Sequence, residues 1–204
     1  MDYKEIEDMF FNDTKDHVLS IIRNDGVNRH IQFKKPGTIC YGFDLITWPG
    51  HLCITGDCGT FVFRRIEDMF SFFRIDIDRG RPGYRLPINL NYWHEKVIAE
   101  SRPGGCKHYS REIFHAAIKE YFDQWAEDQS DEDLKKEIWA KIEDEVLSAD
   151  ENGFMAMNAA MEFDYKDFQF IDFQGTSLQE FTYDYIWCCI AIVWGIQKYD
   201  EATK

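Results

Sequence analysis

The chain of 204 residues has 37 acidic and 23 basic side chains, a formal net charge of −14, and a hydrophobic content of 45%. Aromatic side chains make up 16% of the residues, more than a disordered chain carries, so we expect a folded protein. The net charge repels phosphate, and direct binding of nucleic acid is therefore not expected.

A membrane location is not expected either. No stretch reaches the run of about eighteen apolar residues that a spanning helix needs. The first residues carry Asp2, Glu5, Glu7 and Asp8 where a signal peptide needs positive charge. These features predict a cytoplasmic protein without a membrane partner.

The charge changes along the chain. Residues 1–25 carry a net charge of −4, residues 26–110 carry +4, and residues 111–204 carry −14. The acidity therefore belongs mainly to the second half.

The N-terminal segment is predicted to be helical. Val18, Leu19 and Ile22 form a short apolar stripe, and the cluster of Asn24, Asp25 and Gly26 is typical of a helix C-terminus.

Apolar and polar residues then alternate, which is the period of strands with one buried face. The alternation covers residues 31–34, 41–48, 52–55 and 60–63. Pro49-Gly50 and the segment from Gly56 to Gly59 supply turn residues between the later runs. The pattern predicts an antiparallel meander of about three or four strands.

Helical spacing returns at residues 66–73, and this helix is expected to pack on the apolar face of the sheet. Residues 74–90 are rich in Gly and Pro and are expected to form a loop. The segment from Arg102 to Gly105 is the expected boundary within one domain, residues 1–204. It divides a sheet-containing half, residues 1–105, from an acidic helical half, residues 106–204.

The second half reads mostly as helices. Ser110 and Ser130 are predicted to cap the first two, and a shorter helix is expected over residues 154–161. The residues Ser177 to Glu180 match a capping box before the last helix. From Tyr185 to Ile196 this helix is apolar nearly all round, so it lies in the core or is covered by a second copy in a homo-oligomer.

The cysteines are interpreted as free, mostly buried thiols of a reducing compartment. The alternative is a zinc site, but the sequence lacks the closely spaced ligand pairs that structural zinc sites use. That site would use His51, Cys53, Cys58, Cys106 and His108.

The densest acidic tract covers residues 123–151, with twelve acids and three bases. On one continuous helix the carboxylates would follow at roughly 3.6 Å intervals, comparable with the phosphate spacing of about 3.4 Å along one DNA strand. Such a surface fits a basic groove built for nucleic acid, whereas the residues by themselves favour a solvated face that serves solubility. The predicted partner-binding residues are Asp128, Asp131, Glu132, Asp133, Glu137, Asp144 and Glu145.

A basic loop forms a weaker candidate site for phosphate. Arg79, Arg81 and Arg85 supply guanidinium groups of the kind that bind phosphate, but internal salt bridges to the acidic half explain them better.

An enzymatic alternative rests on the same region. On a strand, Asp76 and Asp78 would face one side, as a divalent metal site requires, and His94 is a candidate acid–base partner. No phosphate-binding glycine loop or familiar catalytic motif accompanies them. Asp57, between Gly56 and Gly59, is a further catalytic candidate, but hairpin-turn chemistry explains it better.

Two segments carry a resemblance to a known family. They are residues 42–74, with Gly42-Phe43-Asp44 and Gly59-Thr60-Phe61, and the terminal run from Trp187 to Gln197. Together they resemble uncharacterised accessory proteins encoded by tailed bacteriophages and prophages. The resemblance implies a bacterial host cytoplasm and the blocking of host machinery, including restriction and CRISPR systems. It implies no catalytic residues.

The expected fold is α+β, a small antiparallel β-meander packed against a mostly helical C-terminal half. The expected function is that of a non-enzymatic phage protein that inhibits a host factor through its acidic helices. The partner would be a basic host protein or a nucleic-acid-binding complex, and no cofactor or metal is expected. The alternative is a metal-dependent enzyme acting on nucleotides or nucleic acid.

Overall fold

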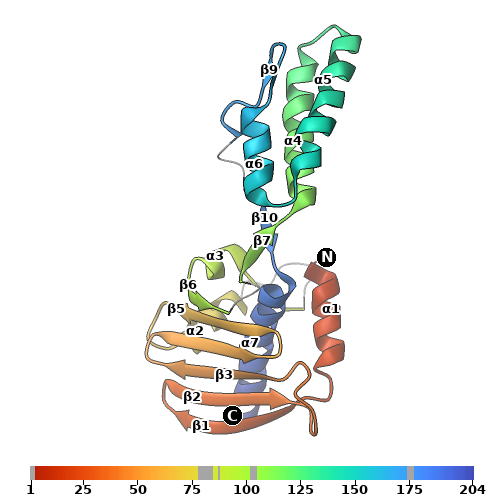
Figure 1. The fold of residues 1–204 in the computed structure, drawn as a ribbon. Helices are drawn as coiled ribbons and strands as arrows, with labels where there is room; N and C mark the ends of the chain where they lie inside the picture. Colours follow the sequence, from red (N-terminus) through yellow and green to blue (C-terminus); the bar gives the residue numbers. More distant parts are fainter. Residues whose placement is uncertain (1–2, 78–84, 87, 102–104, 174–176) are drawn as a thin grey trace. The chain divides into compact units, whose positions relative to one another are not determined.

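The computed structural model describes residues 3–77, 85–86, 88–101, 105–173 and 177–204, without the side chains of residues 75–77. The chain divides into two compact units (Figure 1). The first, called the sheet unit, comprises residues 1–107 and 181–204, and the second, called the acidic unit, comprises residues 108–180. The α+β class predicted from the sequence is confirmed.

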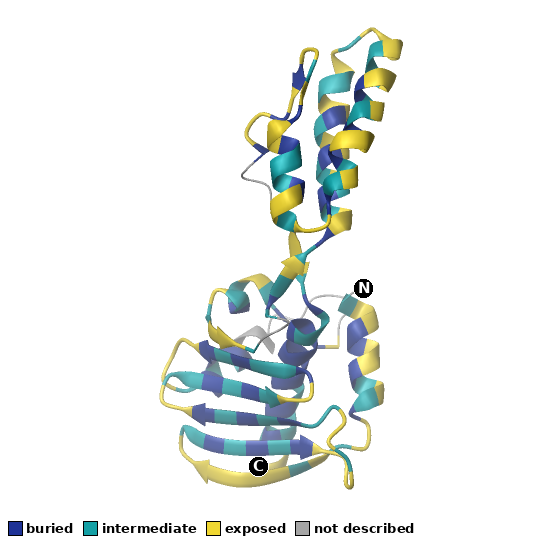
Figure 2. Ribbon diagram, in the orientation of Figure 1, coloured by how far each residue is buried: buried dark blue, intermediate teal, exposed yellow. Residues whose placement is uncertain are grey.

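The sheet unit is built on a six-stranded antiparallel sheet in which each strand pairs with the next in the sequence. The strands are β1 (Val18–Asp25), β2 (Asn28–Lys34), β3 (Phe43–Trp48), β4 (His51–Gly56), β5 (Gly59–Arg64) and β6 (Val97–Glu100). Along β2 to β5 every second side chain is buried, so one face of the sheet forms the core and the other meets solvent (Figure 2). The predicted meander is therefore confirmed and extended.

Three helices complete the core of this unit: α1 (Tyr3–Asp13), α2 (Met69–Ile77) and α7 (Tyr183–Ala202). A short helix, α3 (Leu90–His94), precedes β6. Side chains all round α7 are buried, and a Cβ added at Gly195 would lie 2.8 Å from Leu45 and 3.0 Å from Phe33. This close packing on the sheet accounts for the apolar sequence of α7 without a second copy of the chain.

The predicted N-terminal helix is wrong over residues 18–25. These residues form β1, which pairs with β2, and Gly26 with a φ of +58° lies in the hairpin turn instead of ending a helix. Because β1 is an edge strand with both faces largely exposed, its side chains lack the alternation that marks a strand.

The acidic unit has its own core, formed by α4 (Arg111–Glu127), α5 (Glu132–Glu145) and α6 (Gly153–Glu162). A short 3₁₀ helix, η1 (Leu147–Ala149), lies between α5 and α6, and β8 (Asp164–Tyr165) pairs with β9 (Phe168–Gln169). The chain passes between the units at β7 (Lys107–Tyr109) and β10 (Gln179–Phe181), which form a two-stranded sheet. The acidic unit ends before α7, which belongs to the sheet unit.

The helix caps were partly predicted. Ser110 caps α4 by accepting the N–H of Ile113, as predicted. Asp131 caps α5 in place of Ser130. The predicted capping box at residues 177–180 is wrong, because its last residues form β10 and Thr182 caps α7.

Candidate functional site

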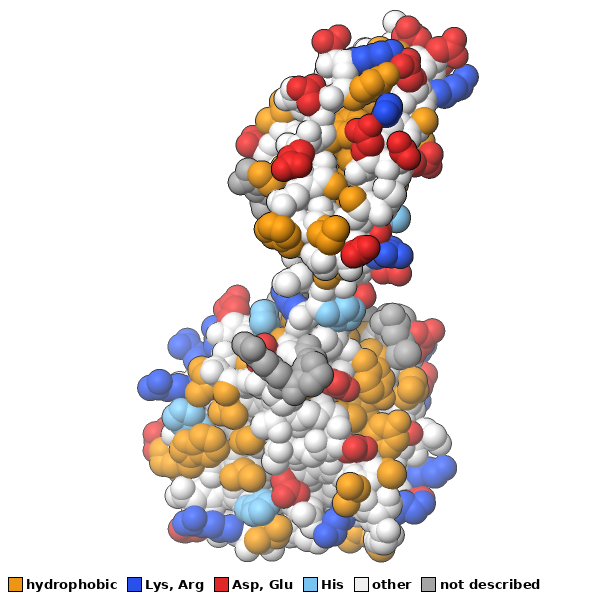
Figure 3. All heavy atoms as spheres, viewed as in Figure 1, with side chains coloured by type: hydrophobic (Ala, Val, Ile, Leu, Met, Phe, Trp, Pro, Cys, Tyr) orange, Lys and Arg blue, Asp and Glu red, His pale blue; other side chains and the backbone are white. Residues whose placement is uncertain are grey.

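The charge of the molecule is concentrated in one unit. Residues 108–180 hold nineteen acids and six bases, a net charge of −13, whereas the sheet unit carries −1. Apolar residues hold α4 against α5, with the rings of Phe122 and Trp139 5.0 Å apart. The inward positions are thus taken by apolar groups, and the acids occupy the outward positions of both helices (Figure 3).

All seven predicted partner-binding carboxylates are on exposed residues. Asp128 follows α4, Asp131 caps α5, and the other five lie on α5. The predicted spacing is nevertheless wrong, because the tract is not one helix: the chain turns between Asp128 and Asp131. The 14 residues of α5 extend for only about 21 Å. The carboxylates therefore form a patch on a helical hairpin rather than a row that matches a DNA strand.

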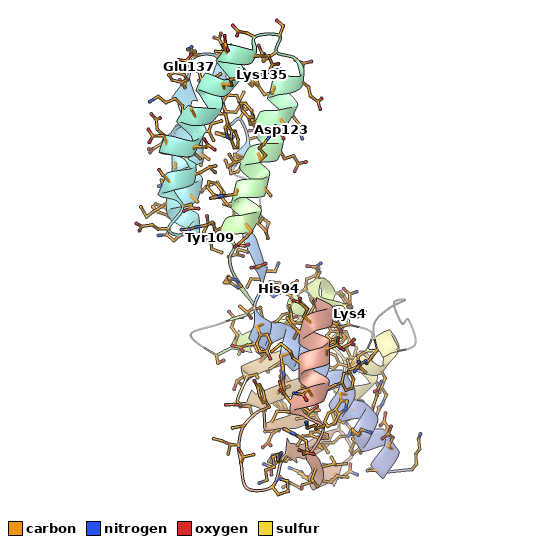
Figure 4. The ribbon with its side chains drawn as sticks, turned by 90° about the vertical axis from the view of Figure 1, so that its right-hand side faces the viewer. Lys4, His94, Tyr109, Asp123, Lys135 and Glu137 are labelled. Carbon is orange, nitrogen blue, oxygen red and sulfur yellow. The ribbon has the colours of Figure 1, made fainter. Side chains whose placement is uncertain are left out.

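Several of these carboxylates have lysine partners (Figure 4 labels Lys135 and Glu137 on α5). Glu132 pairs with Lys135 at 2.8 Å, and Lys166 pairs with Glu137 at 2.5 Å. The hydrogen bond from Lys135 lowers the pKa of Glu132, and that from Lys166, followed by Tyr165, lowers the pKa of Glu137. Two further pairs have the same character: Lys136 with Asp133 at 3.4 Å and Lys141 with Glu145 at 2.8 Å.

The carboxylates of these pairs are exposed, although Lys135 is only 21% exposed, and ion pairs at the surface contribute little to stability. A basic partner can therefore replace a lysine without a large cost. Within the described ranges, neither Asp128 nor Asp144 forms a salt bridge, although Lys141 lies near Asp144 and bonds Glu145 instead. Asp131 is already engaged, because its carboxylate accepts the N–H groups of Asp133 and Leu134 at 3.0 Å.

One carboxylate of the tract is internal. Asp150 has a side chain only 6% exposed and accepts from Nε of Arg111 at 2.9 Å and from Nε2 of His115 at 2.6 Å. Both partners lie in the first turns of α4, whereas Asp150 precedes α6. Asp150 therefore holds α4 to the segment before α6 and is not part of the surface.

Most residues of the enzymatic alternative lie where the structure does not describe their side chains. Asp76 lies in α2 instead of on a strand, so the strand alternation that placed it beside Asp78 does not apply. Asp78, Arg79 and Arg81 lie outside the described residues. Arg85 is engaged within the chain, 2.8 Å from Asp8.

His94 is packed rather than open to a substrate. Its ring contacts the rings of Phe181 and Tyr185, and its Nδ1 is buried without a hydrogen-bond partner. Burial, followed by the charge of Lys107, lowers the pKa of His94, so the ring is neutral at pH 7.

A partly buried polar cluster in the sheet unit was not predicted from the sequence. Asp57 lies in the two-residue turn between β4 and β5, as hairpin chemistry predicts, and its carboxylate accepts the N–H of Tyr41 at 2.8 Å. Tyr41 has a φ of +53°, and its carbonyl lies 3.0 Å from Nε2 of His17. The carboxylate thus holds a strained loop residue in place.

Three polar atoms of this cluster are buried without a hydrogen-bond partner: Oδ2 of Asp13, Nδ1 of His17 and the hydroxyl of Tyr183. Burial is the largest cause that raises the pKa of Asp13, and it also raises the pKa of Asp184 and of Tyr183. These groups come from α1, the following loop and α7, so no local motif signals them.

A hollow of about 510 Å³ opens beside this loop and is lined by residues that include Lys34, Asp44 and Asp57. Its carboxylates are already engaged within the chain. Asp44 accepts from His30 at 2.8 Å and from Gln32 at 3.0 Å, and Asp57 binds the Tyr41 backbone. The hollow therefore presents no paired free carboxylates for acid–base catalysis.

The cysteines are free thiols, of which Cys40 is exposed and Cys53 half-buried, while the other four are buried. Burial raises the pKa of Cys58 to about 12, so its thiol stays protonated. Across the described ranges no three His, Cys, Asp or Glu side chains are grouped to hold a metal ion. Nor does any helix there combine the length and apolar character needed to cross a bilayer.

Comparison with protein-family models, with curated proteins and with solved structures finds no match.

Proposed function

We propose that the protein is a non-enzymatic binding protein whose acidic unit engages a basic surface of another protein. The observation that carries this proposal is the segregation of charge: the acidic unit holds −13 of the net −14, and its carboxylates are exposed on α4 and α5.

Such a charge distribution attracts a basic partner before contact. Charges of one sign gathered on one surface accelerate association, and the attraction falls with ionic strength. The lysines beside Glu132 and Glu137 do not oppose this, because exposed pairs are readily exchanged. Asp128 and Asp144 add carboxylates that form no salt bridge in the described part of the chain. On the resemblance to phage accessory proteins, we expect the partner to be a factor of the bacterial host.

The experiment is capture from a bacterial lysate on the immobilised full chain at about 0.1 M and about 1 M salt, where the Debye length is about 10 Å and 3 Å. A first variant neutralises four exposed acids of the acidic unit, by the substitutions Glu127→Gln, Asp128→Asn, Glu143→Gln and Asp144→Asn. A matched control neutralises four exposed acids of the sheet unit, by Asp25→Asn, Glu67→Gln, Glu95→Gln and Glu201→Gln. Both variants change the net charge equally.

We expect the natural chain and the control to capture the same basic protein at low salt and to release it at high salt. The variant of the acidic unit is expected to lose it. Equal capture by all three chains, or capture that persists at high salt, would show that the acidic surface is not the binding site. Absence of any captured protein at low salt would refute the proposal as well.

A further inference from the structure

Helix α6 presents apolar side chains to solvent. Its inward face consists of small residues, Ala156 and Ala160, both fully buried. On the outward side Phe154 is 75% exposed, Met155 41% and Met161 45%. Side chains of this size are normally buried, and exposed clusters of them mark interaction sites.

A groove runs beside this helix. It has a volume of about 470 Å³ and lies between α6, the end of α5 and η1. Apolar groups line it, among them Ala149, Met155 and Phe163, and Glu145 and Glu162 are the acids of its wall. Methionine adapts to differently shaped partners because its side chain is flexible and polarisable.

The charge around the groove has one sign. Between residues 142 and 165 the sequence contains seven acids and neither Lys nor Arg. One of the seven, Asp150, is internal, whereas Asp144, Glu145 and Glu162 belong to exposed residues. Figure 3 shows hydrophobic side chains gathered over α6 with acidic side chains around them.

We propose that the exposed face of α6, together with the groove beside it, binds a basic amphipathic helix of the partner protein. The apolar stripe of that helix would contact Met155 at the groove and the exposed side chains of Phe154 and Met161 on the same helix, and its Lys or Arg side chains would meet the surrounding carboxylates. The inference rests on the proposed function and names the kind of partner. A second copy of the chain is not the occupant, because it would bring the same negative charge, and an anionic membrane surface is repelled for the same reason.

The probe is a fluorescein-labelled peptide of Leu and Lys, about 18 residues long, with leucines at helical spacing, which makes about five helical turns. A scrambled peptide has the same composition without the apolar stripe. Binding to the full chain is measured by fluorescence anisotropy at about 0.1 M and about 1 M salt. A triple variant removes three exposed apolar side chains of α6 by Phe154→Gln, Met155→Gln and Met161→Gln. Gln is chosen because it forms helices about as well as Met does.

Ile171→Gln is the matched control, because Ile171 is a 67% exposed apolar residue of the same unit that belongs neither to α6 nor to the groove lining. The single variant Phe154→Gln serves as a second test, and circular dichroism checks that each variant is folded. We expect the amphipathic peptide to bind more tightly than the scrambled one, and to keep this advantage at high salt. The triple variant should bind it about tenfold more weakly or worse, and the Ile171 variant should match the natural chain.

Equal binding of the two peptides, or binding that none of the α6 substitutions weakens, would overturn the groove proposal. If the four-carboxylate variant still weakens both peptides in that case, the acidic binding surface stands while the groove fails. If that variant leaves both affinities unchanged, the proposed function fails. Self-association in sedimentation that the triple variant abolishes would assign the groove to a second copy instead.

Discussion

The substitution Gly56→Ala tests the packing that holds the loop containing Tyr41. Gly56 ends β4 and lies opposite Phe43 of β3. A Cβ at this position would lie 2.2 Å from the carbonyl oxygen of Gly42 and 2.8 Å from Cα of Phe43. Both are backbone atoms of a paired segment, so neither can move aside without shifting the start of β3.

The expected cost follows from two opposing terms. Inserting a methyl group into a packed site costs about 1–3 kcal/mol, and the rigid backbone places this site at the upper end. Reduced freedom of the unfolded chain returns about 0.4–1 kcal/mol. The net loss in unfolding free energy is therefore about 2–2.6 kcal/mol. Gly26→Ala is the control, because a Cβ at Gly26 would meet no atom within 4 Å. Only the φ of +58° opposes alanine there, and this backbone strain costs about 1–2 kcal/mol. The reduced freedom of the unfolded chain offsets part of that cost, as it does for Gly56→Ala.

The assay is amide hydrogen exchange by mass spectrometry on peptides from β3 and β4. For Gly56→Ala we expect protection to fall about 30-fold or more, since about 1.4 kcal/mol corresponds to a factor of ten. Peptides of α4 and α5 serve as an internal reference. A loss no greater than that of Gly26→Ala would refute the argument that the backbone contact at Gly56 is rigid.

Two further substitutions test the buried polar groups. For Asp13→Asn we expect a larger free energy of unfolding at pH 7. Burial raises the pKa of Asp13 above its usual 3.8, so the folded protein favours the protonated carboxyl and loses this stability as the pH rises through the raised pKa. Asn is uncharged at every pH and avoids this loss. The gain should shrink to nothing below about pH 3.8 in urea titrations, and a pH-independent difference would contradict this cause. Thr182→Ala should cost about 1–2 kcal/mol, because the hydroxyl accepts the N–H of Tyr185 and donates to the carbonyl of Gly105, and Thr182→Ser should restore most of the loss.

Local patterns in the sequence were sufficient for much of the fold. The alternation in β2 to β5, the Pro49-Gly50 turn and the Ser110 cap each depend on residues a few positions apart. Neighbouring residues determine these features because the repeat of apolar residues in a strand or a helix can be recognised within a short stretch of sequence. Where the local pattern fits both a helix and a strand, tertiary contacts determine which one forms. The apolar stripe of β1 also fits a helix, but the segment pairs with β2 and is therefore a strand.

The acidic tract illustrates the same limit for the candidate site. Sequence identified the tract, its excess of carboxylates and its helical content. It also predicted a new helix starting at Ser130, one residue from the observed cap, but it did not show that Asp150 is internal or that exposed Phe154 lies near the acids. Each of these depends on how one helix packs on another, which the period of a single helix does not specify.

The sequence by itself determined the net charge of −14, its concentration toward the second half and the α+β class. Only the tertiary structure decided that α7 returns to the sheet unit, which leaves −13 on the acidic unit and −1 on the rest. It also brought Asp13, Tyr41 and Tyr183, which are far apart in the sequence, into one partly buried cluster. The physical reason is that composition and periodicity report on neighbours along the chain, whereas the pairing of distant segments is set by burial of the whole apolar surface.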